Sequence, residues 1–223
     1  CILLFLSSLL LAPLGAEVQK IAYKPVATYP HDPSAWTQGL YYSEGNLFES
    51  TGLFEASTLR RVDLTTGRVL QIHSLADEYF AEGLTLLDDK LYQLTWLSGT
   101  GFIYDSETFK KIGEFSYPGE GWGLTHNGSQ LILSDGTEHI RFIDSETLKE
   151  IRRIDVKLGT ESVKDLNELE FAKGYIYANV WYQDIILKID PANGQVVGLV
   201  DRPNNEDAVL NGIAYNKKED AFY

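Results

Sequence analysis

Phe80-Ala81-Glu82-Gly83-Leu84 is one of five copies of a short pattern that recurs along the chain. The other copies are Trp36-Thr37-Gln38-Gly39-Leu40, Gly121-Trp122-Gly123-Leu124, Leu166-Asn167-Glu168-Leu169 and Leu210-Asn211-Gly212-Ile213. When the copies are aligned on the anchor positions Gly39, Gly83, Gly123, Glu168 and Gly212, the steps between them are 44, 40, 45 and 44 residues. A period of about 40–45 residues is the size of one four-stranded propeller blade. The spacing therefore predicts an all-β chain that folds as a β-propeller.

An aspartate follows each of the first four anchors at a nearly constant distance of 21 to 24 residues, at Asp63, Asp105, Asp144 and Asp190. Asp, Ser, Thr and Asn are frequent in turns because their side chains bond to nearby backbone groups. Apolar or alternating runs such as Phe102–Tyr104 and Ile185–Ile189 flank these aspartates. The pattern predicts a strand, a turn and a second strand at the same place in each copy.

The copies follow one another without a break in composition, so we expect a single propeller domain over residues 17–223 with room for five blades. The fifth copy reaches Tyr223 inside its second strand, and we expect this last blade to be truncated at the C-terminus. The segment Ile21–Tyr29 alternates and contains a proline, which suits an edge strand. We expect it to pair with the last blade and close the ring, since closure hides exposed strand edges.

Residues 1–16 have the pattern of a secretory signal peptide whose basic n-region is missing. Ile2–Leu11 is almost wholly apolar, and the small residues of Ala12–Ala16 follow it. The apolar run is too short for a stop-transfer helix. We expect cleavage near Ala16 and an exported protein, periplasmic or secreted, without a stable membrane span. Its only cysteine, Cys1, would then be lost, so no intramolecular disulfide is predicted.

The composition excludes several classes of partner and site. The net charge is −13 and no basic run occurs, which argues against nucleic acid, because phosphate binding needs clustered Lys and Arg. The four histidines share no repeat phase and no i,i+4 spacing, so no metal site is predicted from them. No Gly-x-Ser-x-Gly elbow and no Gly-rich phosphate loop is present.

Two positions of the repeat gather polar and aromatic side chains at one mouth of the predicted channel. The residues just before the anchors are Gln38, Glu82, Trp122, Asn167 and Asn211, and those thirteen after the first four anchors are Gly52, Trp96, Gly136 and Trp181. Taken singly, each is explained as an ordinary channel or core residue. Together an acid, amides and indoles around one mouth indicate a small pocket, since such sites are mostly apolar with a few oriented polar groups.

Seven motifs, in order along the chain, resemble the plant and bacterial type of glutaminyl-peptide cyclotransferase, the glutamine cyclotransferase family. They are Trp36–Leu40, Glu49–Gly52, Ala81–Leu84, Leu91–Trp96, Leu166–Glu170, Ala178–Trp181 and Leu210–Ala214. The resemblance implies a five-bladed β-propeller that acts as an aminoacyltransferase. It would convert the N-terminal glutamine of peptides and proteins to pyroglutamate with release of ammonia, and it would require no zinc or other cofactor.

The resemblance also implies roles for individual residues. Glu82 matches the family's catalytic acid, and Trp36 stands where the family commonly has Phe. The matching substrate-binding residues are Trp36, Gln38, Phe80, Trp96, Trp122, Asn167 and Trp181. The family usually continues the last repeat with a Thr-Gly-Lys segment whose lysine belongs to the site, and Tyr223 precedes that segment. A carboxyl among Phe80 and the indoles is expected to have a raised pKa.

Two other classes of function fit a propeller, because fold alone does not decide function. One is a non-catalytic propeller that binds peptide or protein partners on the same face, which predicts tolerance of Glu82 replacement. The other is a small-molecule enzyme such as a calcium-dependent lactonase, which needs several carboxylates on the axis. The ring offers Glu82, with Glu168 one residue out of phase. A structural calcium in the channel remains an open expectation.

Overall fold

The computed structural model describes residues 18–201 and 209–223, and these residues form strands and turns without any helix. Accordingly, none of the described residues belongs to a helix with the length and apolar character needed to cross a membrane. The expected signal segment, residues 1–16, lies outside the described residues. Cleavage near Ala16 and export therefore stay predictions.

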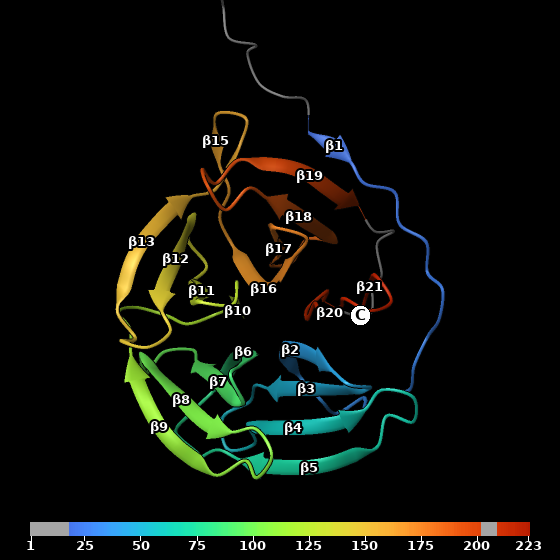
Figure 1. Cartoon of the computed structure of the whole chain (residues 1–223), viewed down its shortest axis with the longest axis vertical. Coiled ribbons are helices and arrows are strands. Elements are labelled where there is room, and N and C mark those ends of the chain that lie inside the picture. Colours follow the sequence, from blue (N-terminus) through green and yellow to red (C-terminus); the bar gives the residue numbers. More distant parts are fainter. Residues whose placement is uncertain (1–17, 202–208) are drawn as a thin grey trace, which may run out of the picture.

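Four blades, each of four antiparallel strands in chain order, are arranged around a common centre (Figure 1). The first two are β2 (Thr37–Ser43), β3 (Asn46–Thr51), β4 (Thr58–Asp63) and β5 (Val69–Ser74), then β6 (Ala81–Leu87), β7 (Lys90–Thr95), β8 (Thr100–Asp105) and β9 (Lys111–Ser116). The next two are β10 (Leu124–His126), β11 (Gln130–Ser134), β12 (His139–Asp144) and β13 (Glu150–Asp155), then β16 (Leu166–Ala172), β17 (Tyr175–Val180), β18 (Ile185–Ile189) and β19 (Val196–Asp201). The predicted all-β propeller is confirmed.

The first strand of each blade lies nearest the centre, and the last strand forms the outer edge (Figure 1). The inner strands β2, β6, β10 and β16 contact one another in ring order. The apolar core lies between adjacent blades, as where Ile140 and Phe142 of the third blade join one cluster with Leu169 and Leu187 of the fourth. The core thus follows from the alternation of each strand, which turns every second side chain toward a neighbouring blade.

Three anchor glycines let the inner strands approach one another more closely than any other residue allows. A Cβ added to Gly39 would overlap the amide nitrogen of Leu84, and one added to Gly83 would overlap that of Leu124. A Cβ on Gly123 would overlap the carbonyl oxygen of Asn167. The recurrence of glycine in the sequence therefore reports backbone contact at the propeller axis.

The predicted aspartate turns are present. Asp63, Asp105 and Asp144 each accept a hydrogen bond of 2.7–2.8 Å from the backbone N–H of the threonine three residues later. Asp190 accepts one of 2.8 Å from the N–H of Ala192. Each turn joins the third and fourth strands of its blade, so the repeat phase read from the sequence is correct.

The fifth copy forms only a small sheet of two strands, β20 (Tyr215–Asn216) and β21 (Ala221–Phe222). This sheet lies between the first and fourth blades, where β20 contacts both β2 and β16 (Figure 1). The described residues thus form four blades and a two-stranded sheet, rather than five blades. A short hairpin projects between the third and fourth blades. Its two strands, β14 (Lys157–Leu158) and β15 (Glu161–Ser162), have two residues each.

The expectation that an N-terminal strand closes the last blade is wrong. The strand β1 is Gln19–Lys20, and it pairs in parallel with β19 at the outer edge of the fourth blade. β19 is the outermost strand of the fourth blade, and its free edge offers unpaired backbone groups to β1. Residues 21–29 are not a strand; Tyr29 instead packs edge-on against Tyr223, with ring centroids 5.9 Å apart.

Candidate functional site

The predicted site residues lie at one end of the propeller, where the first strand of each blade begins and the second ends. In the first three blades one backbone hydrogen bond of 2.9–3.0 Å closes this end: the N–H of Gly52 donates to Trp36, that of Trp96 to Phe80 and that of Trp122 to Ser134. Because the inner strands share one direction around the ring, residues in this phase face the same mouth. The repeat symmetry therefore places the two ring positions together, as predicted.

Aromatic contacts run across three blades at this end. Phe80 packs edge-on against Trp96 with ring centroids 5.7 Å apart, and Trp122 packs edge-on against Trp181 at 5.4 Å. The two pairs are joined by Glu120, whose Oε2 accepts hydrogen bonds from Nε1 of Trp96 at 2.7 Å and Nε1 of Trp122 at 2.8 Å. Edge-to-face geometry and shared hydrogen bonds fix ring orientation as well as position.

A chain of amides closes the remaining part of the ring. The Nδ2 group of Asn211 donates to Oε1 of Gln38 at 2.7 Å, and Nδ2 of Asn167 donates to Oδ1 of Asn211 at 3.3 Å. The three residues come from the first, fourth and fifth copies, and all three stand just before an anchor. In the described part of the chain, Gln38 uses Oε1 for this bond, and no group accepts a hydrogen bond from its Nε2.

Glu82 is the acid of this ring, and its surroundings favour the neutral carboxyl. The residue is only 7% exposed, and its side chain has no hydrogen-bond partner among the described residues. Burial raises the pKa of Glu82 well above its usual value, and the negative charge of Glu120 raises it further. The predicted direction of the shift is confirmed. These surroundings therefore favour the protonated form of the carboxyl over the charged one.

Two further buried carboxyls, Glu168 and Glu170, extend from the inner strand β16. Glu168 accepts hydrogen bonds from the backbone N–H of Leu40 at 3.3 Å and of Ile213 at 2.8 Å, which joins three copies of the repeat. Burial first, and then the charge of Glu170, raises its pKa well above the usual value. Glu170 accepts from the N–H of Tyr215, and burial raises its pKa to about 8. These two carboxyls therefore hold the inner strands together.

No group of three or more His, Cys, Asp or Glu side chains suited to a metal ion occurs in residues 18–201 and 209–223. The structural calcium and the independence from cofactors stay predictions, since neither is tested by this arrangement.

Trp36 is the predicted site residue that the structure keeps apart. The residue is 60% exposed, and among the described residues no ring contact or side-chain hydrogen bond joins its indole to the other site residues. Sequence analysis also missed Glu120, which stands in a loop, two residues before Trp122. Its signals were this proximity and Asp165, an acid that stands at the same distance before the fourth anchor.

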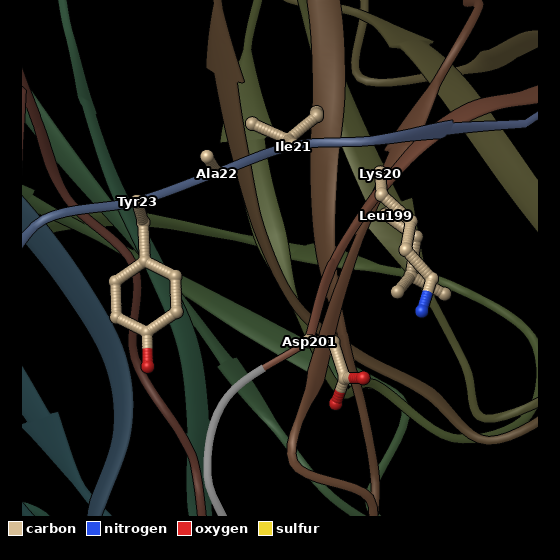
Figure 2. Close-up of a pocket in the computed structure, with 6 residues that line it drawn as sticks. All are labelled: Lys20, Ile21, Ala22, Tyr23, Leu199 and Asp201. Atoms are coloured by element: carbon tan, nitrogen blue, oxygen red, sulfur yellow. The ribbon is translucent and has the colours of Figure 1, made fainter.

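A separate pocket lies where β1 meets β19 (Figure 2). It is lined by Lys20, Ile21, Ala22, Tyr23, Leu199 and Asp201. None of these belongs to the predicted site, and the lining offers one cation and one carboxylate beside apolar groups. The chemistry of the candidate site therefore lies at the mouth of the ring.

Comparison with known proteins adds independent findings. A family model described as glutamine cyclotransferase matches residues 2–223. The glutaminyl-peptide cyclotransferase of Arabidopsis thaliana is 40% identical over 210 residues, which cover 89% of this chain and 66% of that protein. The chain thus spans slightly less than two thirds of that relative.

Solved structures agree with the fold. The crystal structure of Myxococcus xanthus glutaminyl cyclase matches with a TM-score of 0.79 and 37% identity, covering 87% of each chain. The WD40 β-propeller domain of Doa1 matches with a TM-score of 0.55 over 79% of this chain and 56% of that one. At 12% identity the latter supports the propeller fold alone.

Proposed function

The chain belongs to the glutamine cyclotransferase family, and from this premise we propose that it converts the N-terminal glutamine of peptides and proteins to pyroglutamate with release of ammonia. One observation carries the proposal. Glu82 is a buried carboxyl with a raised pKa and no hydrogen-bond partner among the described residues, at a mouth lined by indoles and amides. This arrangement supplies a carboxyl that favours its protonated form, beside indoles and amides that can contact a glutamine side chain.

The cyclisation requires one proton to move between two nitrogens of the substrate. The neutral α-amine attacks the carbon of its own side-chain carboxamide, a C–N bond forms, and the carbonyl oxygen becomes an oxyanion. Protonated Glu82 gives its proton to the leaving amide nitrogen, which departs as ammonia when the second C–N bond breaks. The resulting carboxylate then takes a proton from the attacking nitrogen and returns to its starting state.

Binding contributes much of the rate, because the nucleophile and the electrophile belong to one molecule. A pocket that holds the glutamine curled brings the amine to its carboxamide carbon and removes the entropy cost of that approach. Gln38, which accepts from Asn211 through Oε1, keeps Nε2 to stabilise the oxyanion or the carboxamide oxygen. We assign the walls of the pocket to Phe80 and to the indoles of Trp96, Trp122 and Trp181, which exclude water and so favour cyclisation over hydrolysis.

The test is ammonia release from a glutamine-initiated dipeptide amide, with the product identified by mass as the substrate minus one ammonia. Glu82→Gln keeps the shape of the side chain but has no acidic proton, and we expect kcat to fall by about 10²–10⁴-fold. Glu114→Gln, at a position whose side chain is 63% exposed, serves as the matched control. Turnover of Glu82→Gln equal to that of the control would refute the proposed role.

The same assay in the presence of a strong chelator tests the prediction that no metal is needed. We expect unchanged turnover, since the mechanism requires only proton transfer and hydrogen bonding. A loss of activity that zinc or calcium restores would contradict this expectation.

We further propose that β20 and β21 occupy the place of a fifth blade. Support comes from the contacts of β20 with β2 and β16 and from the hydrogen bond between the N–H of Ile213 and Glu168. Hydrogen exchange measured by mass spectrometry tests this, and we expect the amide of Ile213 to exchange as slowly as those of the inner strands. Exchange at the rate of an exposed loop would contradict the assignment.

We propose that the protein acts in a periplasm or outside the cell. The apolar run Ile2–Leu11 followed by small residues supports this. Sequencing of the N-terminus of the mature protein, isolated from the exported fraction of an expressing cell, would test it. A mature chain that still contains Ile2–Leu11 would argue against cleavage near Ala16.

A further inference from the structure

Glu120 is a half-buried acid in the loop that links the second and third blades. The loop begins after β9 ends at Ser116 and finishes where β10 begins at Leu124. Its position brings one carboxylate between the indole pair, by which we mean Trp96 of the second blade and Trp122 of the third. The repeat singled out Trp122 and Gly123 in this loop, but not Glu120.

Both members of the indole pair donate to the same oxygen, Oε2 of Glu120, at 2.7 and 2.8 Å. An indole has a single N–H donor, so a hydrogen bond to it selects one of the two flipped orientations of the ring. Bonds to an ionised acceptor are stronger than neutral ones. Trp96 packs edge-on against Phe80, and Trp122 packs edge-on against Trp181. The carboxylate of Glu120 therefore contacts both halves of this group of four aromatic side chains.

The loop that carries Glu120 is itself held in place. On one side, Nη1 of Arg141 donates to the carbonyl of Pro118 at 2.6 Å. On the other, the N–H of Gly121 donates to the carbonyl of Trp96 at 3.0 Å. The backbone of Gly119 has a φ of +80°, which glycine adopts at little cost. The carboxylate is therefore presented from a fixed backbone and not from a freely moving arm.

We propose that Glu120 is a positioning residue for the cyclisation, because its carboxylate orients the indole pair and places a negative charge beside Glu82. The inference deepens the activity proposed above and rests on it. Glu120 acts through other groups: it sets the walls that hold the glutamine and the charge that the proton donor experiences.

The electrostatic part of the role agrees with the surroundings of Glu82. Burial is the first cause of the raised pKa of Glu82, and the charge of Glu120 is the second. Tyr117, from the same loop, also faces Glu82, and its pKa is raised to about 12, mainly by burial. Beyond the loop, Arg141 is paired with Asp135, so its positive charge is already compensated. The carboxylate of Glu120 is thus the charge whose removal changes Glu82 most.

Two substitutions separate the two parts of the role. Glu120→Gln keeps an oxygen acceptor for the indoles but removes the charge, so kcat/KM at its optimum should stay within about threefold. The limb on which kcat/KM falls at high pH, where Glu82 loses its proton, should move to lower pH. Glu120→Ala removes both functions, and we expect kcat/KM to fall about 10- to 100-fold, as for loss of hydrogen bonds to a charged group. Glu114→Gln is the control for both.

Tryptophan emission gives a readout that does not depend on turnover. Glu120→Ala should shift the emission of the indoles, whereas Glu120→Gln and Glu114→Gln should match the wild type. The emission should also change with pH as Glu82 titrates, and this change should be absent in Glu82→Gln. The midpoint of the change should lie at lower pH in Glu120→Gln than in the wild type. A wild type that releases no ammonia would refute the proposed activity, while these emission comparisons would still decide the role of Glu120.

Unchanged emission and unchanged kcat/KM in Glu120→Ala would overturn the positioning of the indoles. An unshifted limb and an unshifted midpoint in Glu120→Gln would overturn the effect on Glu82. If Glu120→Ala fails to fold, Glu120→Gln still tests the effect of the charge. Glu120→Asp then tests the length of the side chain, since a shorter acid cannot contact both indoles. We expect Glu120→Asp to lower kcat/KM, as alanine would.

Discussion

Replacement of Glu170 by glutamine should flatten the dependence of stability on pH. Glu170 is buried on β16, and its pKa is raised from 4.5 to about 8, mainly by burial. Between these two values the folded protein binds a proton at this carboxyl that the unfolded chain has released. The stabilisation is fully present below the unfolded pKa, and it is lost as pH rises through the folded pKa. The free energy of unfolding therefore falls with increasing pH across this window.

The magnitude follows from the linkage relation. One proton of difference changes the free energy of unfolding by about 1.4 kcal/mol per pH unit. Over the three units between pH 5 and pH 8, the upper limit for Glu170 is about 4 kcal/mol. Glutamine resembles the neutral acid and keeps a carbonyl oxygen for the N–H of Tyr215, which donates to Glu170 at 3.1 Å. The variant should therefore lose slope while it keeps the hydrogen bond from Tyr215.

The assay is equilibrium unfolding in urea, followed by tryptophan emission at a series of pH values. Wild type and Glu170→Gln should differ in slope by close to one proton, with equal m-values. Removal of the Glu170 charge should also lower the pKa of Glu168, because that charge is a cause of its rise. Glu107→Gln, where the side chain is 82% exposed, is the control and should keep the wild-type slope. Identical slopes for wild type and Glu170→Gln would refute the reasoning.

Two further substitutions test the contacts beneath the site. In Ser134→Ala, the N–H of Gly123 loses its acceptor at 2.7 Å, and the carbonyl of Asn167 loses its donor at 2.6 Å. The free energy of unfolding measured in urea should therefore fall by about 1–3 kcal/mol. An unchanged urea midpoint would contradict this prediction. In Arg141→Ala, the buried carboxylate of Asp135 is left unpaired, and thermal and urea unfolding should show a loss of about 3–5 kcal/mol. The double variant with Asp135→Ala should recover part of that loss, and a double variant less stable than Arg141→Ala would show that the unpaired charge is not its cause.

The propeller and the ring of site residues were predictable because the same physical requirement recurs in every copy. Close approach at the axis demands glycine at Gly39, Gly83 and Gly123, and the turn between outer strands favours aspartate. Such requirements make the same residue types recur at a regular spacing in the sequence. This spacing gives the position within the blade of neighbouring residues such as Glu82. The family resemblance built on these motifs is confirmed by the family model and the relatives.

Features that occur once leave no such trace. Glu120 lies in one loop only, and its importance depends on two indoles that approach it from different blades. The pairing of β1 with β19 likewise depends on which strand edge is free in three dimensions, which alternation within Ile21–Tyr29 does not reveal. The exposure of Trp36 depends on the direction of its side chain at a blade end, although its backbone phase was correct.

The fourth anchor is Glu168, whereas the other four anchors are glycine, and the structure gives a physical reason for this difference. At the first three anchors a Cβ would overlap the backbone of the next inner strand, so only glycine fits. Glu168 lies instead on β16, and β20 of the short fifth copy stands between β16 and β2 (Figure 1). The carboxyl of Glu168 accepts from Leu40 on one side and Ile213 on the other. Where backbones cannot meet directly, a long side chain supplies the hydrogen bonds, so glycine and glutamate perform the same task of closing the ring.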